Sequence, residues 1–67
     1  MIGVMSAAEL SSLSTALDEL TRRVSEHADA AHAGKDEETA RELFAVERAL
    51  NGANRRLARL ATALGRR

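Results

Sequence analysis

The sequence predicts an all-α fold, an antiparallel two-helix coiled-coil hairpin that dimerises into a four-helix bundle. Apolar residues recur at alternating spacings of three and four in two runs, and a short break at residues 34–36 separates the runs. This spacing is typical of a coiled-coil seam. The 67 residues also include no proline, the residue that most strongly interrupts a helix. We therefore expect two long helices joined by a tight turn.

The first helix is predicted over about residues 6–33, and residues 1–5 are expected to be disordered. Ser6 and Glu9 form a capping-box pattern, in which each side chain can bond the backbone N–H of the other residue. His27 is the one polar member of the apolar row that follows. The row comprises Leu10, Leu13, Leu17, Leu20, Val24, His27 and Ala31.

The turn is predicted at about residues 34–36 and the second helix at about residues 37–65. Gly34 suits a left-handed helix end, and Asp36 suits the N-cap of the next helix. Glu37 and Glu38 would stabilise that helix, because their negative charges lie near the positive end of its dipole. The second apolar row comprises Thr39, Leu43, Val46, Leu50, Ala53, Leu57, Leu60 and Leu64.

The two rows match when the chain doubles back about Lys35. Leu20 then faces Leu50, and every other member of the first row also faces a member of the second row without a slip. We take this shared register as evidence for a hairpin over one continuous helix. The predicted intramolecular seam comprises Leu10, Leu13, Leu17, Leu20, Val24, His27, Leu43, Val46, Leu50, Ala53, Leu57 and Leu60.

Self-association is predicted because two helices alone cannot fully bury these leucines, and a chain this short leaves much of its surface exposed. It contains no cysteine that could form a stabilising disulfide. One flank of the hairpin carries mostly small or uncharged residues, which would allow a second copy to approach closely. This predicted self-association interface comprises Thr21, Ala28, Ala40, Phe44, Glu47, Asn51, Asn54, Ala58 and Ala61.

Two features of this flank have alternative interpretations. We expect Phe44 to contact a second molecule, the alternative being a partly exposed ring along its own helix. Glu47, Asn51 and Asn54 are expected to form a hydrogen-bonded layer that fixes how two hairpins dock, the alternative being a ligand pocket.

The charge is distributed unevenly although the chain is neutral overall. Residues 1–47 contain ten acids and four bases, whereas residues 48–67 contain six arginines and no acid. These arginines could bind phosphates or an acidic protein surface. Alternatively, they could interact favourably with the negative end of the helix dipole and neutralise part of the charge of the acidic first helix. The possible ridge for an anionic partner comprises Arg48, Arg55, Arg56, Arg59, Arg66 and Arg67.

The sequence does not indicate an enzyme, a cofactor site or a metal site. His27 and His32 are five residues apart on a helix and so point about 140° apart, which prevents them from sharing one ion. No apolar run approaches the roughly 18 residues needed to span a bilayer, and no signal-peptide pattern opens the chain. We expect a cytoplasmic protein and no membrane attachment. Nine arginines against one lysine are typical of a bacterium with a GC-rich genome.

The expected function is that of a small homodimeric adaptor or regulator that acts by binding another, unidentified protein. The alternative is a small nucleic-acid-binding hairpin dimer that uses the arginine ridge.

Overall fold

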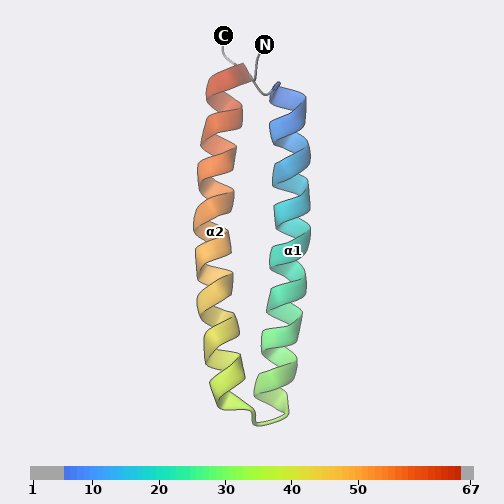
Figure 1. The fold of residues 1–67 in the computed structure, drawn as a ribbon, viewed down its shortest axis with the longest axis vertical. Helices are drawn as coiled ribbons and strands as arrows, with labels where there is room; N and C mark the ends of the chain where they lie inside the picture. The colour runs from blue at the N-terminus through green and yellow to red at the C-terminus, as the bar shows by residue number, and fades with distance from the viewer. Residues whose placement is uncertain (1–5, 66–67) are drawn as a thin grey trace.

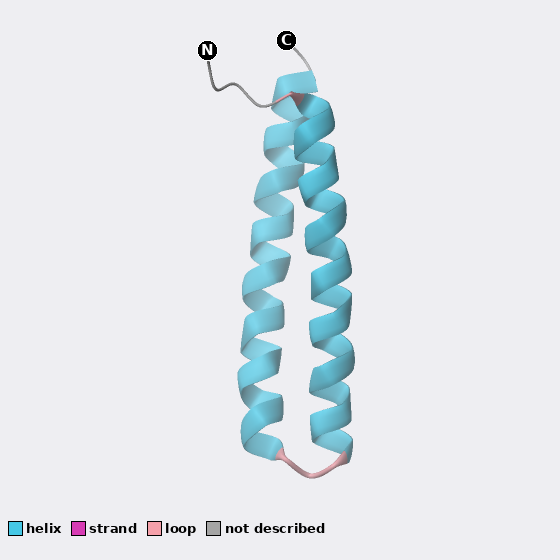
Figure 2. Cartoon of the chain, turned by 45° about the vertical axis from the view of Figure 1, so that its right-hand side comes forward, coloured by secondary structure: helices cyan, strands magenta, loops and turns pink. Residues whose placement is uncertain are grey.

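The chain forms a helical hairpin, in which two long antiparallel helices lie side by side and a short turn joins them (Figures 1 and 2). The helices are α1 (Ala7–Ala33) and α2 (Glu37–Gly65). The computed structural model describes residues 6–65, so the predicted disorder of residues 1–5 lies outside the described residues. The hairpin predicted from the sequence is confirmed.

The hairpin is a rod of 49 × 18 × 14 Å. The start of α1 and the end of α2 lie at one end of the rod, and the turn lies at the other (Figure 1). We call the end with the turn the tip, and the end where α1 starts and α2 finishes the open end.

A capping box fixes the start of α1. The Ser6 hydroxyl accepts a hydrogen bond from the Glu9 N–H at 3.1 Å, and the Ser6 N–H donates to the Glu9 carboxylate at 3.0 Å. The hydrogen bond that the Ser6 backbone N–H donates to the Glu9 carboxylate lowers the pKa of Glu9. The first N–H groups of a helix lack partners within it, so this reciprocal pair sets where the helix begins.

The turn ends α1 with a Schellman arrangement. The Asp36 N–H donates to the Ala31 carbonyl at 2.9 Å, and the Lys35 N–H donates to the His32 carbonyl at 3.0 Å. The left-handed residue is Lys35, with φ 64°, whereas Gly34 has φ −82°. The expectation that Gly34 takes this conformation is therefore wrong. The Gly34 N–H still bonds the Ala30 carbonyl, so the helical hydrogen bonding reaches Gly34 and the left-handed position falls one residue later.

Replacing Lys35 by glycine is expected to raise the free energy of unfolding by up to about 1 kcal/mol. A left-handed conformation costs a residue with a Cβ about 1–2 kcal/mol, partly offset by the greater freedom of glycine in the unfolded chain. Thermal unfolding followed by circular dichroism at fixed protein concentration measures the change.

Gly34→Ala is the matched control for that variant. A Cβ at Gly34 would meet the Ala30 and Ala31 carbonyl oxygens at 3.4 and 3.7 Å, which is ordinary contact, and φ is accessible to alanine. It should be neutral or slightly stabilising. A lower unfolding temperature for Lys35→Gly would show that the lysine is not strained.

The contact between the helices follows one row of residues on each helix. The three buried side chains of the described residues are those of Leu10, Ala28 and Ala40, and half-buried residues continue their spacing of three and four. On α1 the row comprises Leu10, Ser14, Leu17, Thr21, Val24, Ala28 and Ala31. On α2 it comprises Ala40, Leu43, Glu47, Leu50, Asn54, Leu57, Ala61 and Leu64.

This row lies beside the predicted seam and shares only part of it. Leu10 is buried as predicted for the seam, and Leu17, Val24, Leu43, Leu50, Ala53 and Leu57 are half-buried. In contrast, Leu13, Leu20, Val46 and Leu60 are 44–48% exposed, and His27 is exposed as well.

The observed contact row differs from the predicted seam because the apolar stripe on each helix is wider than one row. Each helix carries two overlapping rows at the same spacing, and contact with one partner helix can bury only one of them. Small residues such as Ala28 and Ala40 let the two backbones approach closely, so the row that contains them forms the contact. The larger side chains of the neighbouring row remain on the surface.

The register also differs from doubling back about Lys35. The Asn54 amide donates to the Thr21 hydroxyl at 3.1 Å, whereas the predicted pairing would place Ala49 opposite Thr21. Side chains lean toward the N-terminus of their own helix. In antiparallel helices they therefore meet partners displaced along the rod from the residue directly opposite.

Candidate interaction surface

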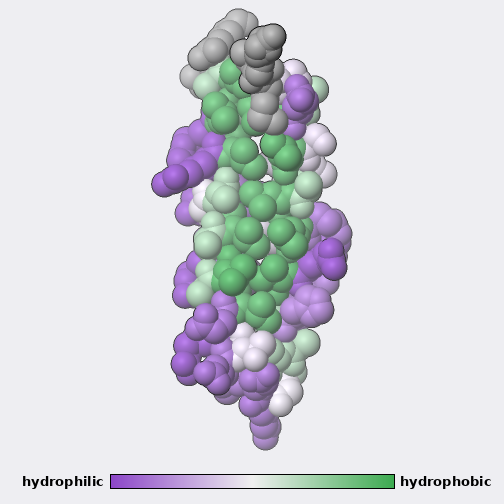
Figure 3. All heavy atoms as spheres, viewed as in Figure 1, coloured by the Kyte–Doolittle hydropathy of each residue, from purple (hydrophilic) through white to green (hydrophobic). Residues whose placement is uncertain are grey.

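The most distinctive surface of the hairpin is a continuous apolar band on one broad side. Figure 3 shows this band over both helices, with hydrophilic residues along its two edges and at the tip. We call it the apolar face, and define it by the exposed side chains of Leu13, Leu20, Val46 and Leu60. Half-buried leucines from the helix contact border it, among them Leu17, Leu50 and Leu57.

The rod exposes more surface than a compact monomer of its mass would. Its accessible surface is 4995 Å², against about 4100 Å² expected for a folded monomer of 7.2 kDa. Its radius of gyration is 15.3 Å, against about 11 Å for a compact domain of this length. The side that carries the apolar face has an outline of 49 × 18 Å. A standard interface buries roughly 800 Å² on each partner, so it would need most of this side of the rod.

Most of the small residues predicted for self-association lie between α1 and α2 instead. Ala28 and Ala40 are buried there, and Thr21, Glu47, Asn54 and Ala61 are half-buried. Asn51 and Ala58 are exposed. The surface left open to a partner is therefore the leucine-rich one, which the coiled-coil spacing had predicted for the interior. The second row at coiled-coil spacing, through Ser14, Thr21 and Ala28, is the signal that could have revealed this.

A polar layer joins the two helices near the middle of the rod. The Thr21 hydroxyl donates a hydrogen bond to the Leu17 carbonyl at 2.7 Å and accepts one from the side-chain amide of Asn54. The Asn54 Oδ1 is buried and has no hydrogen-bond partner among the described residues. Such a layer favours one register, because any slip would leave more polar atoms unpaired.

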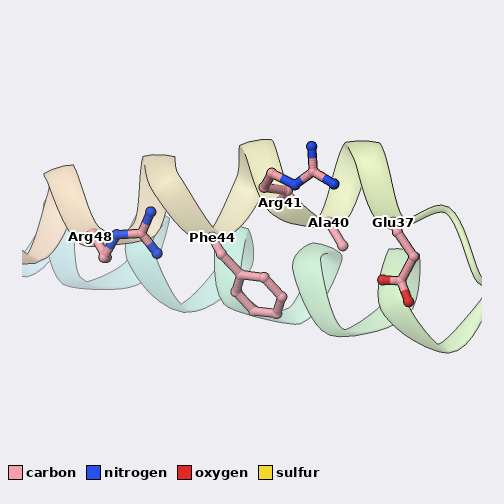
Figure 4. A pocket seen from close by; sticks show the side chains of 5 residues that line it. All are labelled: Glu37, Ala40, Arg41, Phe44 and Arg48. Atoms are coloured by element: carbon pink, nitrogen blue, oxygen red, sulfur yellow. The ribbon is translucent and has the colours of Figure 1, made fainter.

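Phe44, the only aromatic residue, borders a hollow on α2. The hollow is lined by Glu37, Ala40, Arg41, Phe44 and Arg48 (Figure 4). The half-buried Phe44 ring extends toward α1, whereas the Arg41 guanidinium points away from it. Phe44 and Val46 are two residues apart and so point about 200° apart on the helix, which places the hollow away from the apolar face.

The predicted arginine ridge is open to solvent where the structure describes it. Arg48, Arg55, Arg56 and Arg59 are exposed, and none of them forms an ion pair with another described residue. Arg66 and Arg67 lie outside the described residues. The ion pairs of residues 6–65 join Arg22 to Glu19 and to Glu26, and His32 to Glu37.

His32 and Glu37 link the two helices across the turn. The His32 Nδ1 lies 2.9 Å from the Glu37 carboxylate. The hydrogen bond and charge of Glu37, with a smaller effect of Asp29, raise the pKa of His32. A group with a raised pKa contributes stability that is full below its unfolded pKa, near 6.5, and is lost as the pH rises through the folded pKa.

The hairpin is therefore expected to melt at a higher temperature near pH 6 than near pH 8. The His32→Gln variant should lose this part of the pH dependence, because its side chain cannot gain a charge. Thermal melts at several pH values measure the effect, and His27→Gln serves as the matched control, since no ion pair of the described residues includes His27. If the His32→Gln variant kept the pH dependence of the wild-type melting temperature, that dependence would arise from other groups.

The described residues show neither a metal site nor a membrane span. No group of three His, Asp or Glu side chains within residues 6–65 could hold a metal ion. Neither α1 nor α2 is long and apolar enough to cross a bilayer.

The chain matches no known family model, no curated protein and no solved structure.

Proposed function

We propose that the chain is a small homodimeric helical adaptor or regulatory protein that acts through protein–protein interaction. The observation that carries the proposal is the apolar face, on which Leu13, Leu20, Val46 and Leu60 are each 44–48% exposed. Contiguous apolar patches on a small protein mark interaction sites.

Energetics support a second copy as the first partner. Full burial of a leucine or valine side chain stabilises a protein by roughly 1.5–3 kcal/mol, and among the leucines and valines of the described hairpin only Leu10 is buried. Small single-core folds are marginal, and oligomerisation is one common source of the missing stability. Two apolar faces in contact would form a four-helix bundle with a leucine core.

An adaptor also needs a surface for its second partner. The hollow beside Phe44 points away from the apolar face, so it would stay open in such a dimer. Arg41 and Arg48 there suit carboxylates, and the Phe44 ring suits an apolar side chain. Glu37 lines the hollow as well, so we propose a protein segment with an apolar side chain flanked by charged side chains of both signs as the class of partner that it fits.

Sedimentation equilibrium over micromolar to hundreds of micromolar concentration tests the dimer. The expected mass is twice 7.2 kDa. The melting temperature should also rise with protein concentration, because association stabilises the folded state by mass action. A monomer at tens of micromolar with a concentration-independent melting temperature would overturn the proposal.

Nucleic-acid binding is the second candidate function, favoured by the exposed Arg55, Arg56 and Arg59 near the open end. Binding through them would be sequence-independent and would weaken steeply with salt. A mobility-shift assay with duplex DNA and RNA at low salt tests this function. No shift at tens of micromolar protein would remove it.

A further inference from the structure

We infer that two copies pack apolar face to apolar face with their tips at opposite ends of the bundle. This inference rests on the proposed dimer and specifies its geometry.

The apolar face alone does not choose the orientation. The Thr21–Asn54 hydrogen bond lies close to the middle of both helices, next to Leu20 in α1 and Asn51 in α2. The apolar band extends from this level toward both ends of the rod, over Leu13 and Leu60 on one side and Val46 on the other. A two-fold axis across the rod at this level would bring the two faces together with the tips opposite, whereas a two-fold axis along the rod would bring them together with the tips side by side.

Charge distinguishes the two orientations. The tip side, residues 24–47, carries seven acids and two bases, a net charge of −5. The open-end side, residues 6–17 and 55–65, carries one acid and three arginines, a net charge of +2, and two more arginines follow at positions 66 and 67 of the sequence. Every Asp, Glu, Lys and Arg in these stretches is exposed except Glu47, which is half-buried.

With the tips together, the tip sides of the two copies, each with a net charge of −5, would face each other across the bundle. With the tips opposite, each would face the positive end of the other copy. Packed helices lie 8–10 Å apart, and the Debye length is about 8 Å at physiological ionic strength, so these charges are screened only in part. The tips-opposite arrangement is therefore electrostatically favoured.

The same geometry gives the arginines a role inside the dimer. Arg55, Arg56 and Arg59 of one copy would lie alongside the acidic tip side of the other. The partner's acids then offset the positive potential that would otherwise attract phosphates. A tips-opposite dimer thus accounts for the exposed arginines without a nucleic-acid partner.

Distances between spin labels test the orientation. The chain has no cysteine, so Ala33→Cys introduces a single labelling site on an exposed residue beside the turn. Residue 33 is 13 residues from the middle of α1, so tips-opposite packing separates the two labels by about 39 Å along the rod. Tips-together packing places them at the same level, so that only the width of the bundle separates them. Pulsed electron paramagnetic resonance resolves the two cases.

A second label gives the reciprocal distance. Thr62→Cys places a label on an exposed residue near the open end. In a mixture of the two labelled proteins, the tips-opposite dimer gives a new short distance between residue 33 of one copy and residue 62 of the other. Short 33–33 distances together with a dimer mass would overturn the inference and leave the dimer standing. A monomer mass with no intermolecular coupling would overturn the proposed dimer itself.

Charge reversal at the tip tests the cause. Glu38→Lys combined with Glu42→Lys changes the tip-side charge from −5 to −1, and both residues are exposed. We expect the dissociation constant to rise several-fold, or a short 33–33 population to appear, with a smaller response to added salt. Unchanged distances and an unchanged dissociation constant would overturn electrostatic control of the orientation.

Discussion

Replacing Leu20 by glutamate is expected to dissociate the dimer and leave the internal contact of the hairpin intact. Leu20 is 45% exposed in the single chain and lies near the middle of the apolar face. In a symmetric dimer the two copies together lose the burial of two half-exposed leucines, roughly 1.5–3 kcal/mol in all, and each copy must also desolvate a carboxylate. The dissociation constant should therefore rise at least about 100-fold. Sedimentation equilibrium measures it.

Thr15→Glu is the matched control for this charge. Thr15 is exposed on the same helix and points about 140° away from Leu20, off the apolar face. The Thr15→Glu variant adds the same charge as Leu20→Glu, but at a site off the apolar face. It should therefore leave the dimer mass and the dissociation constant nearly unchanged. Equal dissociation by both variants would mean that net charge, rather than the apolar face, governs association. A Leu20→Glu protein that stays dimeric would place the interface elsewhere.

Replacing Ala28 by leucine is expected to destabilise the hairpin by about 1–3 kcal/mol, because the larger side chain overpacks a close helix contact. Ala28 is fully buried, with 0% of its surface exposed. A two-helix fold has little stability to spare, so we expect a marked loss of helix signal at 25 °C and a lower urea midpoint. Circular dichroism measures both quantities.

Ala30→Leu is the control for this substitution. Ala30 is exposed two residues along the same helix, where leucine is a good helix former and meets no partner helix. Its effect should stay within about 0.5 kcal/mol. The pair also distinguishes the two rows at coiled-coil spacing. If the row through Leu13, Leu20 and His27 formed the helix contact, Ala28 would lie at its edge and Ala28→Leu would behave like Ala30→Leu.

The spacing of the leucines indicated that they form apolar rows, but not whether each row lies between the two helices or on the outside of the hairpin. The prediction placed Leu13, Leu20, Val46 and Leu60 inside the hairpin and Ala28 and Ala40 on the outer flank. The structure exposes the first set and buries the second. Both placements satisfy the same spacing of three and four, so periodicity alone cannot choose between them.

The features that depend on neighbours along the chain could be predicted from the sequence alone. The capping box at Ser6, the end of α1 near Gly34 and the N-cap at Asp36, whose carboxylate accepts from the Thr39 N–H, all follow from contacts within six residues. Three other features became known from the fold: which row of each helix faces the other, which register joins Thr21 to Asn54, and which residue of the turn is left-handed. These features depend on how closely two backbones can approach and on the lean of side chains along antiparallel helices, neither of which a local pattern contains.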